Sequence, residues 1–271
     1  MLSETFLAQL VEVILTRSAF SGVEGRWIQA VGLTGSHARG SATPYSDVDI
    51  HVFVPAEDIP AYEVYALRRF EDHLLSISIV TMADKRAELT RPESAIRTVP
   101  GLRQMRVLYE AEAGVLQGLV QAAHDFRWEP LQPAANAFAS RHLCGLAEEA
   151  HKALSGLSRD DDSTTLYATY GLVLGLSDVI AVAHGLLQAT ENMAFQQVMD
   201  FMGGHSTWTY AFRTAAGFDP QASVASRGRA GVALYTQTAR HLHAIIEPQH
   251  QDVINKAVEL IDAFIRTETN S

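Results

Sequence analysis

The chain has 271 residues, 47% of them hydrophobic, and a net charge of −10 at pH 7. This length and content suffice for one large domain or two modest ones with a substantial core. The charge is shared equally, at −5 each, by the residues before and after position 130. No partner nucleic acid is expected, because phosphate contacts require a basic surface, whereas an acidic surface attracts a polycationic small molecule.

The cysteine content and the N-terminal sequence indicate a reducing, aqueous environment. Cys144 is the single cysteine, so no intrachain disulfide can form. The first 21 residues are amphipathic and interrupted by charged side chains such as Glu12 and Arg17, unlike a secretory signal peptide. From the sequence, no stretch is expected to be long and apolar enough to span a bilayer. We therefore expect a cytoplasmic protein with no membrane partner.

The first half alternates predicted helices and strands. A helix over 3–18 precedes a strand over 27–33, a glycine-serine turn with one helical turn, and a strand over 48–54. Pro60 opens a predicted helix to about Phe70, and β-branched residues predict a strand over 73–81. After the helix breaker Pro100-Gly101, a strand over 105–110 and a helix over 114–126 complete a mixed α/β domain, placed at residues 1–130.

Strand signals disappear in the second half, after Pro130 and Pro133. Helical patterns cover residues 134–157, 164–187, 192–202 and 207–216, and two further helices follow. Short polar loops join them, and the aspartates at 160–162 suit capping of the next helix. Residues 131–271 are therefore predicted to form an all-helical bundle, so the fold class is α/β followed by α.

The stretch over 33–53 contains the residues best suited to chemistry. Gly35-Ser36, followed by Arg39, offers a tight turn, a hydroxyl and a guanidinium where a strand gives way to a short helix. Backbone N–H groups at such a turn converge on an anion, and glycine allows a phosphate to approach closely. Asp47 and Asp49 follow about ten residues later, on one face of an alternating strand.

Neither feature is specific by itself, since two nearby aspartates more often mark a solvated strand end. Two carboxylates side by side repel each other, and a hard divalent cation such as Mg²⁺ relieves that repulsion. A phosphate-binding turn beside a metal-binding pair therefore indicates phosphoryl or nucleotidyl transfer.

The order and spacing of these residues resemble the Gly-Ser…Asp-x-Asp signature of the nucleotidyltransferase superfamily, which includes DNA polymerase β and the aminoglycoside nucleotidyltransferases. The local sequence is similar to that of the kanamycin nucleotidyltransferases, where the arginine and a Pro-Tyr-Ser-Asp approach recur, here Pro44 to Asp47. The domain layout of the whole chain resembles that family too. The resemblance implies ATP as co-substrate, Mg²⁺ bound by Asp47 and Asp49, and nucleotide contacts from Gly35, Ser36, Arg39 and Ser46.

A second candidate pair lies on the predicted helix over 134–157. Glu148 and Lys152 are four residues apart and share a face, and this spacing alone favours a solvated salt bridge. The resemblance to the kanamycin nucleotidyltransferases implies instead that Glu148 is a general base and Lys152 a phosphate contact. In that family the glutamate serves the neighbouring subunit's nucleotide site, so a homodimer is implied.

One position departs from the superfamily pattern. A third acid is usual on the strand after the motif, but here the matching positions are Ser76 and Ser78. Either the acid comes from elsewhere in the chain or the site is catalytically weakened.

These observations predict an enzyme that transfers AMP from ATP to a hydroxyl of a small molecule, with an aminoglycoside-like antibiotic as the candidate acceptor. Two alternatives stay open: a catalytically weakened nucleotide-binding protein, and an adenylyltransferase that acts on a protein or RNA.

The histidines singled out in the sequence are not expected to take part in catalysis or metal binding. His51 shares the face of the aspartates and is expected to be buried or at the rim of the site. His37 is expected to face solvent. His241 and His243 have no acid or cysteine at ligand spacing, so no zinc site is predicted there.

Overall fold

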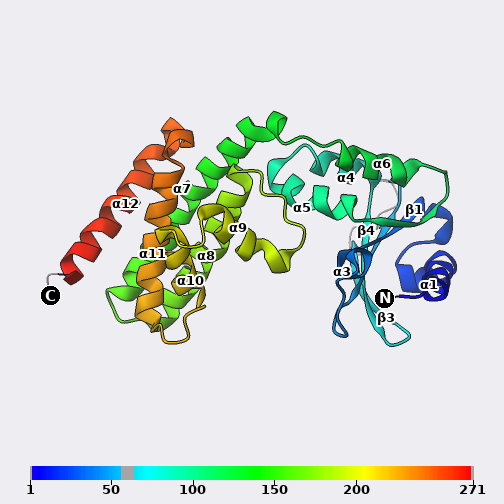
Figure 1. Ribbon diagram of the computed structural model, residues 1–271, viewed down its shortest axis with the longest axis horizontal. Coiled ribbons are helices and arrows are strands. Elements are labelled where there is room, and N and C mark those ends of the chain that lie inside the picture. The colour runs from blue at the N-terminus through cyan, green and yellow to red at the C-terminus, as the bar shows by residue number, and fades with distance from the viewer. Residues whose placement is uncertain (1, 56–63, 270–271) are drawn as a thin grey trace. The chain divides into compact units, whose positions relative to one another are not determined.

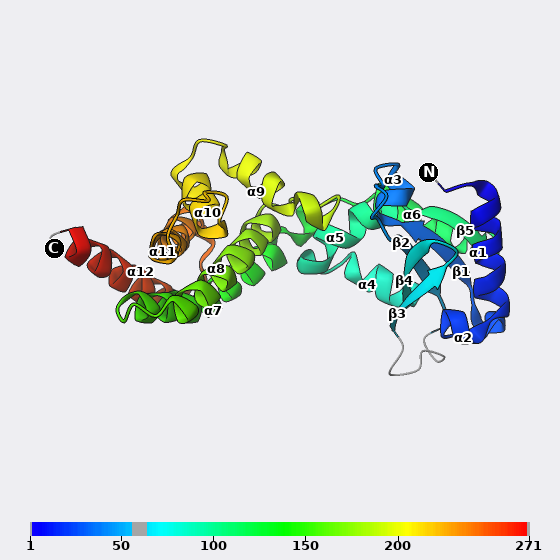
Figure 2. The same cartoon turned by 90° about the horizontal axis from the view of Figure 1, so that it is seen from below.

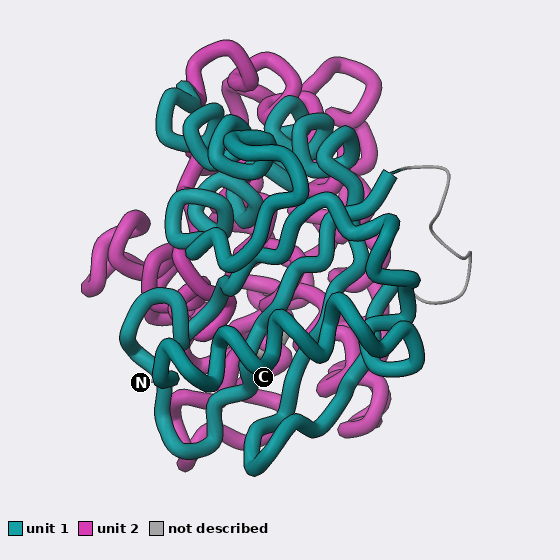
Figure 3. The backbone as a smooth tube through the Cα atoms, turned by 90° about the vertical axis from the view of Figure 1, so that its right-hand side faces the viewer, with its two compact units in different colours: residues 1–127 teal, residues 128–271 magenta. Residues whose placement is uncertain are grey.

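The computed structural model describes residues 2–55 and 64–269. The chain divides into two compact units, residues 1–127 and 128–271, which Figure 3 colours separately. The first is a mixed α/β unit and the second is helical, which confirms the predicted fold class.

A five-stranded mixed sheet with the strand order β3-β4-β2-β1-β5 forms the centre of the first unit (Figure 1). Its strands are β1 (Ala30–Thr34), β2 (Val48–Phe53), β3 (Tyr65–Phe70), β4 (His73–Val80) and β5 (Arg106–Glu110). The pair β2–β4 is parallel and the other three pairs are antiparallel. β2, which contains the second aspartate of the motif, is therefore an interior strand.

Helices lie on both faces of this sheet (Figure 2). They are α1 (Glu4–Thr16), α2 (Ser18–Ser21), α3 (Gly35–Arg39), α4 (Met82–Glu88), α5 (Pro92–Arg103) and α6 (Val115–His124). The apolar side of α1 packs on one face, where Leu10 and Ile14 are fully buried. Residues of α5 and α6, including Leu102 and Leu116, cover part of the other face.

Successive side chains of β2 lie on opposite faces of the sheet, as predicted. Val48, Ile50 and Val52 are fully buried in the core beneath α1, whereas Asp49 and His51 are half-buried on the opposite face. Phe53 also lies on that opposite face and is fully buried in the core formed with α5 and α6. The core therefore closes over one end of this face, and the carboxylate of Asp49 lies toward the other end.

Two predicted elements of the first unit are wrong. The helix expected from Pro60 to Phe70 is, over its described part, strand β3, which pairs antiparallel with β4 through a tight turn at Glu71; Pro60 itself lies outside the described residues. Pro100 does not interrupt a helix, because it lies inside α5 near its C-terminal end. Proline lacks the N–H that would donate to the carbonyl four residues before it, and only three residues of α5 follow Pro100, so the disturbance is confined to the end of the helix.

The second unit contains the predicted long helices. They are α7 (Gln132–Leu157), α8 (Asp162–Ala183), α9 (Ala194–Met202), α10 (Thr207–Ala216), α11 (Val224–His241) and α12 (Pro248–Thr269). The capping role of the 160–162 loop is confirmed, because the Asp161 carboxylate accepts a hydrogen bond from Thr164 N at 3.0 Å at the start of α8.

Helix α8 is an exception to the expectation that no segment is long and apolar enough to span a bilayer. Among the described residues it is the one helix whose length and composition would suffice to cross a bilayer. However, 61% of its apolar window is buried inside the unit, where it packs closely on α7. At Gly175 a Cβ would lie 2.6 Å from a methyl carbon of Leu146, so a larger residue there would require the Leu146 side chain to shift. Its apolar composition is that of a core helix.

Candidate functional site

The glycine-serine turn is in contact with the second aspartate. β1 leads into α3 at Gly35, whose φ of +66° lies in the left-handed region. A Cβ at Gly35 would lie 1.9 Å from Asp49 Oδ2, so only glycine leaves room for this carboxylate. The sheet register brings them together, since Thr34 of β1 pairs with Asp49 of β2. Two features that the sequence separates by about ten residues therefore form one site.

The two aspartates form a suitable donor set for Mg²⁺. Asp47 immediately precedes β2, Asp49 lies within it, and both side chains are half-buried. Mg²⁺ is typically bound by one or two carboxylates, with water and substrate phosphates completing its octahedron. In the ranges 2–55 and 64–269 no three His, Cys, Asp or Glu side chains gather at metal-ligating distance. A cation here would thus take two protein carboxylates and its remaining ligands from water or a nucleotide.

The serines on β4 occupy the positions where the superfamily usually has a third acid. In the parallel register Asp49 pairs with Ser76, and His51 pairs with Ser78. The hydroxyl of Ser76 donates to the Tyr65 hydroxyl oxygen at 3.3 Å. The structure therefore agrees with the departure seen in the sequence: the two positions on the strand beside Asp49 contribute hydroxyls and no carboxylate.

Arg39 and Ser46 contact other parts of the chain. Arg39 Nη1 donates to Gln104 Oε1 at 3.3 Å, from the residue that follows α5. Ser46 Oγ accepts from Thr43 N at 2.9 Å, and Ser46 N donates to Thr43 O at 3.1 Å, which closes a turn directly before Asp47. Arg39 thus lies near the turn as expected, and Ser46 shapes the loop that presents Asp47. Nothing in the sequence around Gln104 indicated this contact with Arg39.

Helix α4 adds an ion pair that the sequence analysis missed. Lys85 Nζ lies 2.9 Å from Glu88 Oε2, and the two side chains are only 16% and 22% exposed. Burial lowers the pKa of His51 to about 4, with Lys85 adding to the effect and Glu88 opposing it. His51 is therefore neutral at pH 7, and its half-buried position agrees with the expected rim or core role.

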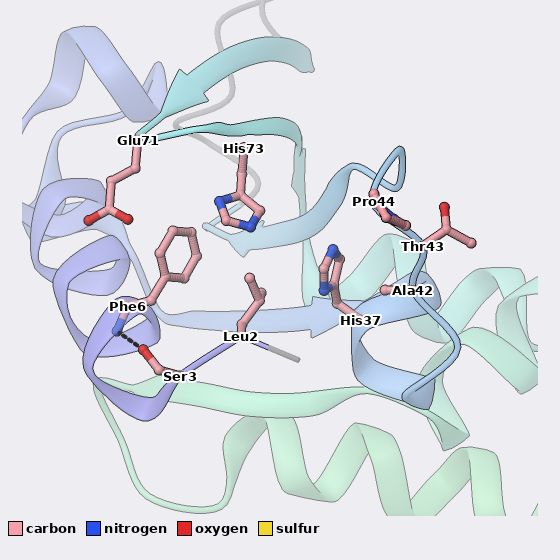
Figure 4. Close-up of a pocket in the computed structure, with 9 residues that line it drawn as sticks. All are labelled: Leu2, Ser3, Phe6, His37, Ala42, Thr43, Pro44, Glu71 and His73. Atoms are coloured by element: carbon pink, nitrogen blue, oxygen red, sulfur yellow. Dashed lines mark hydrogen bonds between the residues drawn. The ribbon is translucent and has the colours of Figure 1, made fainter.

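Contrary to the expectation, His37 does not face solvent. Both of its ring nitrogens are buried, and burial lowers its pKa, while the nearby backbone of Ser46 opposes this shift. Its ring faces His73 in a T-shaped arrangement, with centroids 6.2 Å apart, across a pocket of about 560 Å³ (Figure 4). The pocket also touches Phe6 of α1 and the loop at Thr43. The short helix turns this side chain inward, which the polar sequence around it did not indicate.

The candidate residues of the second unit form a three-membered cluster on α7. Lys152 Nζ lies 2.8 Å from Glu148 Oε1 and 2.9 Å from Glu149 Oε1. The predicted pair is present, and Glu149 was missed. Glu148 is the outer carboxylate, with 73% of its side chain exposed, whereas Glu149 is 19% exposed and packs against Gly171 of α8.

Lys152 sets the protonation of this cluster. Its hydrogen bond to Glu148, together with its charge, holds the pKa of that carboxyl below the usual range. The hydrogen bonds that Lys152 donates to Glu148 and Glu149 raise its own pKa in turn. At neutral pH Glu148 is therefore unprotonated and Lys152 is charged.

Comparisons with known proteins agree with this geometry. Residues 17–98 match the family described as "Nucleotidyltransferase domain". A solved structure, a nucleotidyltransferase-like protein from Exiguobacterium sibiricum, aligns with 96% of this chain and 92% of its own at 12% sequence identity and a TM-score of 0.52, which shows a shared fold. No curated protein matches the chain. The matched segment spans the glycine-serine turn, both aspartates and β4, so this part of the first unit is similar to nucleotidyltransferase domains.

Proposed function

We propose that the protein is an Mg²⁺-dependent adenylyltransferase that moves AMP from ATP to a hydroxyl of a small molecule and releases pyrophosphate. The contact between Gly35 and Asp49 carries this proposal, because it joins the glycine-serine turn to the carboxylate pair within the segment that matches a nucleotidyltransferase domain. The acidic charge of the chain favours a polycationic acceptor, and the local resemblance to the kanamycin nucleotidyltransferases makes an aminoglycoside-like compound the first candidate.

The residues of the first unit would bind and orient the nucleotide. Asp47 and Asp49 would hold Mg²⁺, which when bound polarises the α-phosphate and neutralises the departing pyrophosphate. Ser36 and the backbone of the turn at Gly35 would contact the phosphates. Arg39 would add a guanidinium to the same anion, and its contact with Gln104 would hold that side chain toward the turn.

The α7 cluster would serve the acceptor. Glu148 would accept the proton of the attacking hydroxyl, and Lys152 would contact the triphosphate. A phosphate that draws Lys152 away from Glu148 removes the interaction that lowers the carboxyl pKa. Glu148 would then become a stronger base when the nucleotide is bound, which improves proton transfer near neutral pH. In the family this glutamate acts on the neighbouring subunit's nucleotide, so we propose a homodimer.

The decisive experiment follows transfer of a label from the α-phosphate of ATP in the presence of Mg²⁺ and a panel of aminoglycosides. Label should appear on a small hydroxyl compound together with pyrophosphate. Asp47→Asn should lower the rate at least about 100-fold, since it removes a metal ligand from the reacting phosphate. Asp125→Asn is the matched control, because this exposed aspartate lies in the same unit beyond α6 and should leave the rate unchanged.

One observation supports a second candidate function. Ser76 stands beside Asp49 where a third carboxylate is usual in the superfamily, so the chain could bind ATP without transferring AMP. Nucleotide binding with no turnover for any acceptor would establish this pseudoenzyme. Label that appears on a protein or RNA would favour the remaining alternative and exclude a small-molecule acceptor.

A further inference from the structure

Two histidines far apart in the sequence meet in the second unit. His184 is the residue that caps the C-terminus of α8, and His241 is the last residue of α11. Their Nε2 atoms lie 2.9 Å apart, and the ring centroids are separated by 5.1 Å. No ligand partner of His241 could be recognised from local spacing, because 57 residues separate the two histidines.

The surroundings of this pair favour a cation. The carboxyl end of a helix carries partial negative charge from its unpaired carbonyls, and here two such ends meet. The start of α7 is also present, and it contributes the uncharged amides of Gln132 and Asn136. Burial lowers the pKa of both histidines, so at neutral pH both rings are uncharged and each keeps a lone pair.

A pocket of about 320 Å³ opens beside the pair. Its described lining contains the two histidines, the two amides and apolar residues such as Leu242, and no lysine or arginine. A water molecule occupies about 30 Å³ in the liquid, so several fit here with hydrogen-bonding partners. The ring of Phe201 packs on His184 with centroids 4.5 Å apart and limits its rotation.

We propose that His184 and His241 bind a divalent ion of the late first-row transition metals, such as Zn²⁺, through their two Nε2 atoms, with water as the remaining ligands. Imidazole nitrogen is a preferred ligand of these ions. Tetrahedral coordination with metal–nitrogen bonds of about 2.0–2.1 Å places two nitrogens about 3.3 Å apart. The observed 2.9 Å would need to widen only slightly.

The proton of the existing hydrogen bond has a defined destination. In the neutral pair one ring donates its Nε2–H to the lone pair of the other, whose own proton is on Nδ1. When the ion binds, the donor ring moves its proton from Nε2 to Nδ1, and both Nε2 lone pairs face the metal. No proton is lost, and both rings end in the same tautomer.

The test is a Zn²⁺ titration of the full chain, followed by long-range ¹H–¹⁵N NMR of the imidazoles. One ring should begin with its proton on Nε2, and both should end with it on Nδ1 at one Zn²⁺ per chain. His184→Gln and His241→Gln should each weaken zinc binding at least tenfold. His243→Gln is the matched control, since that ring contacts the carbonyl of Arg240 instead, and it should bind zinc as the unmodified protein does.

The same titration in an Asp47→Asn variant separates this site from the proposed nucleotide site, because zinc held by His184 and His241 is unaffected by that change. Unchanged tautomers in the unmodified protein, or equal affinity in His184→Gln and His243→Gln, would overturn the proposal and leave a structural hydrogen bond only. Thermal unfolding of each variant checks its fold, and the tautomer result does not depend on any substitution.

Discussion

At the scale of single residues, Gly35 combines two requirements at one position. Its φ of +66° suits glycine, and the space that a side chain would need contains Asp49 Oδ2. Gly40 closes the same short helix with a similar φ of +73°, but nothing lies within 4 Å of where its Cβ would be. Substitutions at Gly35 and Gly40 can therefore separate the cost of backbone strain from the effect of displacing the Asp49 carboxylate.

We predict that Gly35→Ala and Gly40→Ala each cost about 1 kcal/mol of stability through backbone strain. Only Gly35→Ala should also weaken binding of Mg²⁺-ATP, because its methyl group must displace the Asp49 carboxylate. Isothermal titration with Mg²⁺-ATP measures the difference. Equal affinities in the two variants would show that Asp49 does not need its position against the turn.

The residues of the site differ in how far sequence predicts them. Asp47 and Asp49 follow from local alternation, which the strand preserves. The contact of Arg39 with Gln104 depends on where α5 ends, 65 positions away in the chain, so no local pattern contains it. Glu149 was missed for a similar reason, since only its packing on Gly171 of α8 distinguishes it from the more exposed Glu148.

At the scale of elements, the errors cluster where tertiary pairing overrides local propensity. Residues 65–70 have the composition of a helix, but β4 offers them a strand partner, and Arg68 and Arg69 suit an edge strand. Strands β1, β2, β4 and β5 were predicted because buried strands are rich in β-branched and apolar residues. The helices of the second unit were predicted well because their periodicity persists over many turns.

The junction of β5 and α6 depends on one carboxylate. Glu110 Oε1 accepts from Leu116 N at 2.7 Å and Gln117 N at 3.0 Å, and Oε2 accepts from Gly114 N at 3.1 Å. Partial burial raises the pKa of this carboxyl, but the three backbone donors outweigh it and hold the pKa below the usual value. The carboxylate therefore caps the amino end of α6 from the end of the neighbouring strand.

We predict that Glu110→Gln costs about 1 kcal/mol at pH 7, as loss of a helix cap does, and lowers the melting temperature by a few degrees. Because the folded-state pKa is depressed, the contribution is complete above the unfolded pKa of about 4.3 and disappears as pH falls through the folded value. Thermal melts by circular dichroism from pH 3 to 7 test this. Glu112→Gln is the control in the same loop, and a pH-independent difference would contradict the capping role.

At the scale of the whole molecule, the residues proposed for catalysis are divided between the two units. The turn and the aspartates belong to residues 1–127, and Glu148 and Lys152 belong to residues 128–271. If Glu148 serves the nucleotide of a neighbouring subunit, each active site in a homodimer needs Asp47 from one chain and Glu148 from the other. Two inactive variants can then repair each other, which no single-chain site allows.

We predict that Asp47→Asn and Glu148→Gln are each nearly inactive alone, and that their mixture recovers activity after subunit exchange. Random exchange makes half of the dimers mixed, and each mixed dimer has one site with both native residues, so about a quarter of the native activity should return. The assay is label transfer from ATP after mild dissociation and reassociation, with Asp125→Asn replacing one partner as the control for dilution. Recovery that stays at the level of the separate variants, in a mixture shown to exchange, would place Glu148 and Asp47 of one site in the same chain.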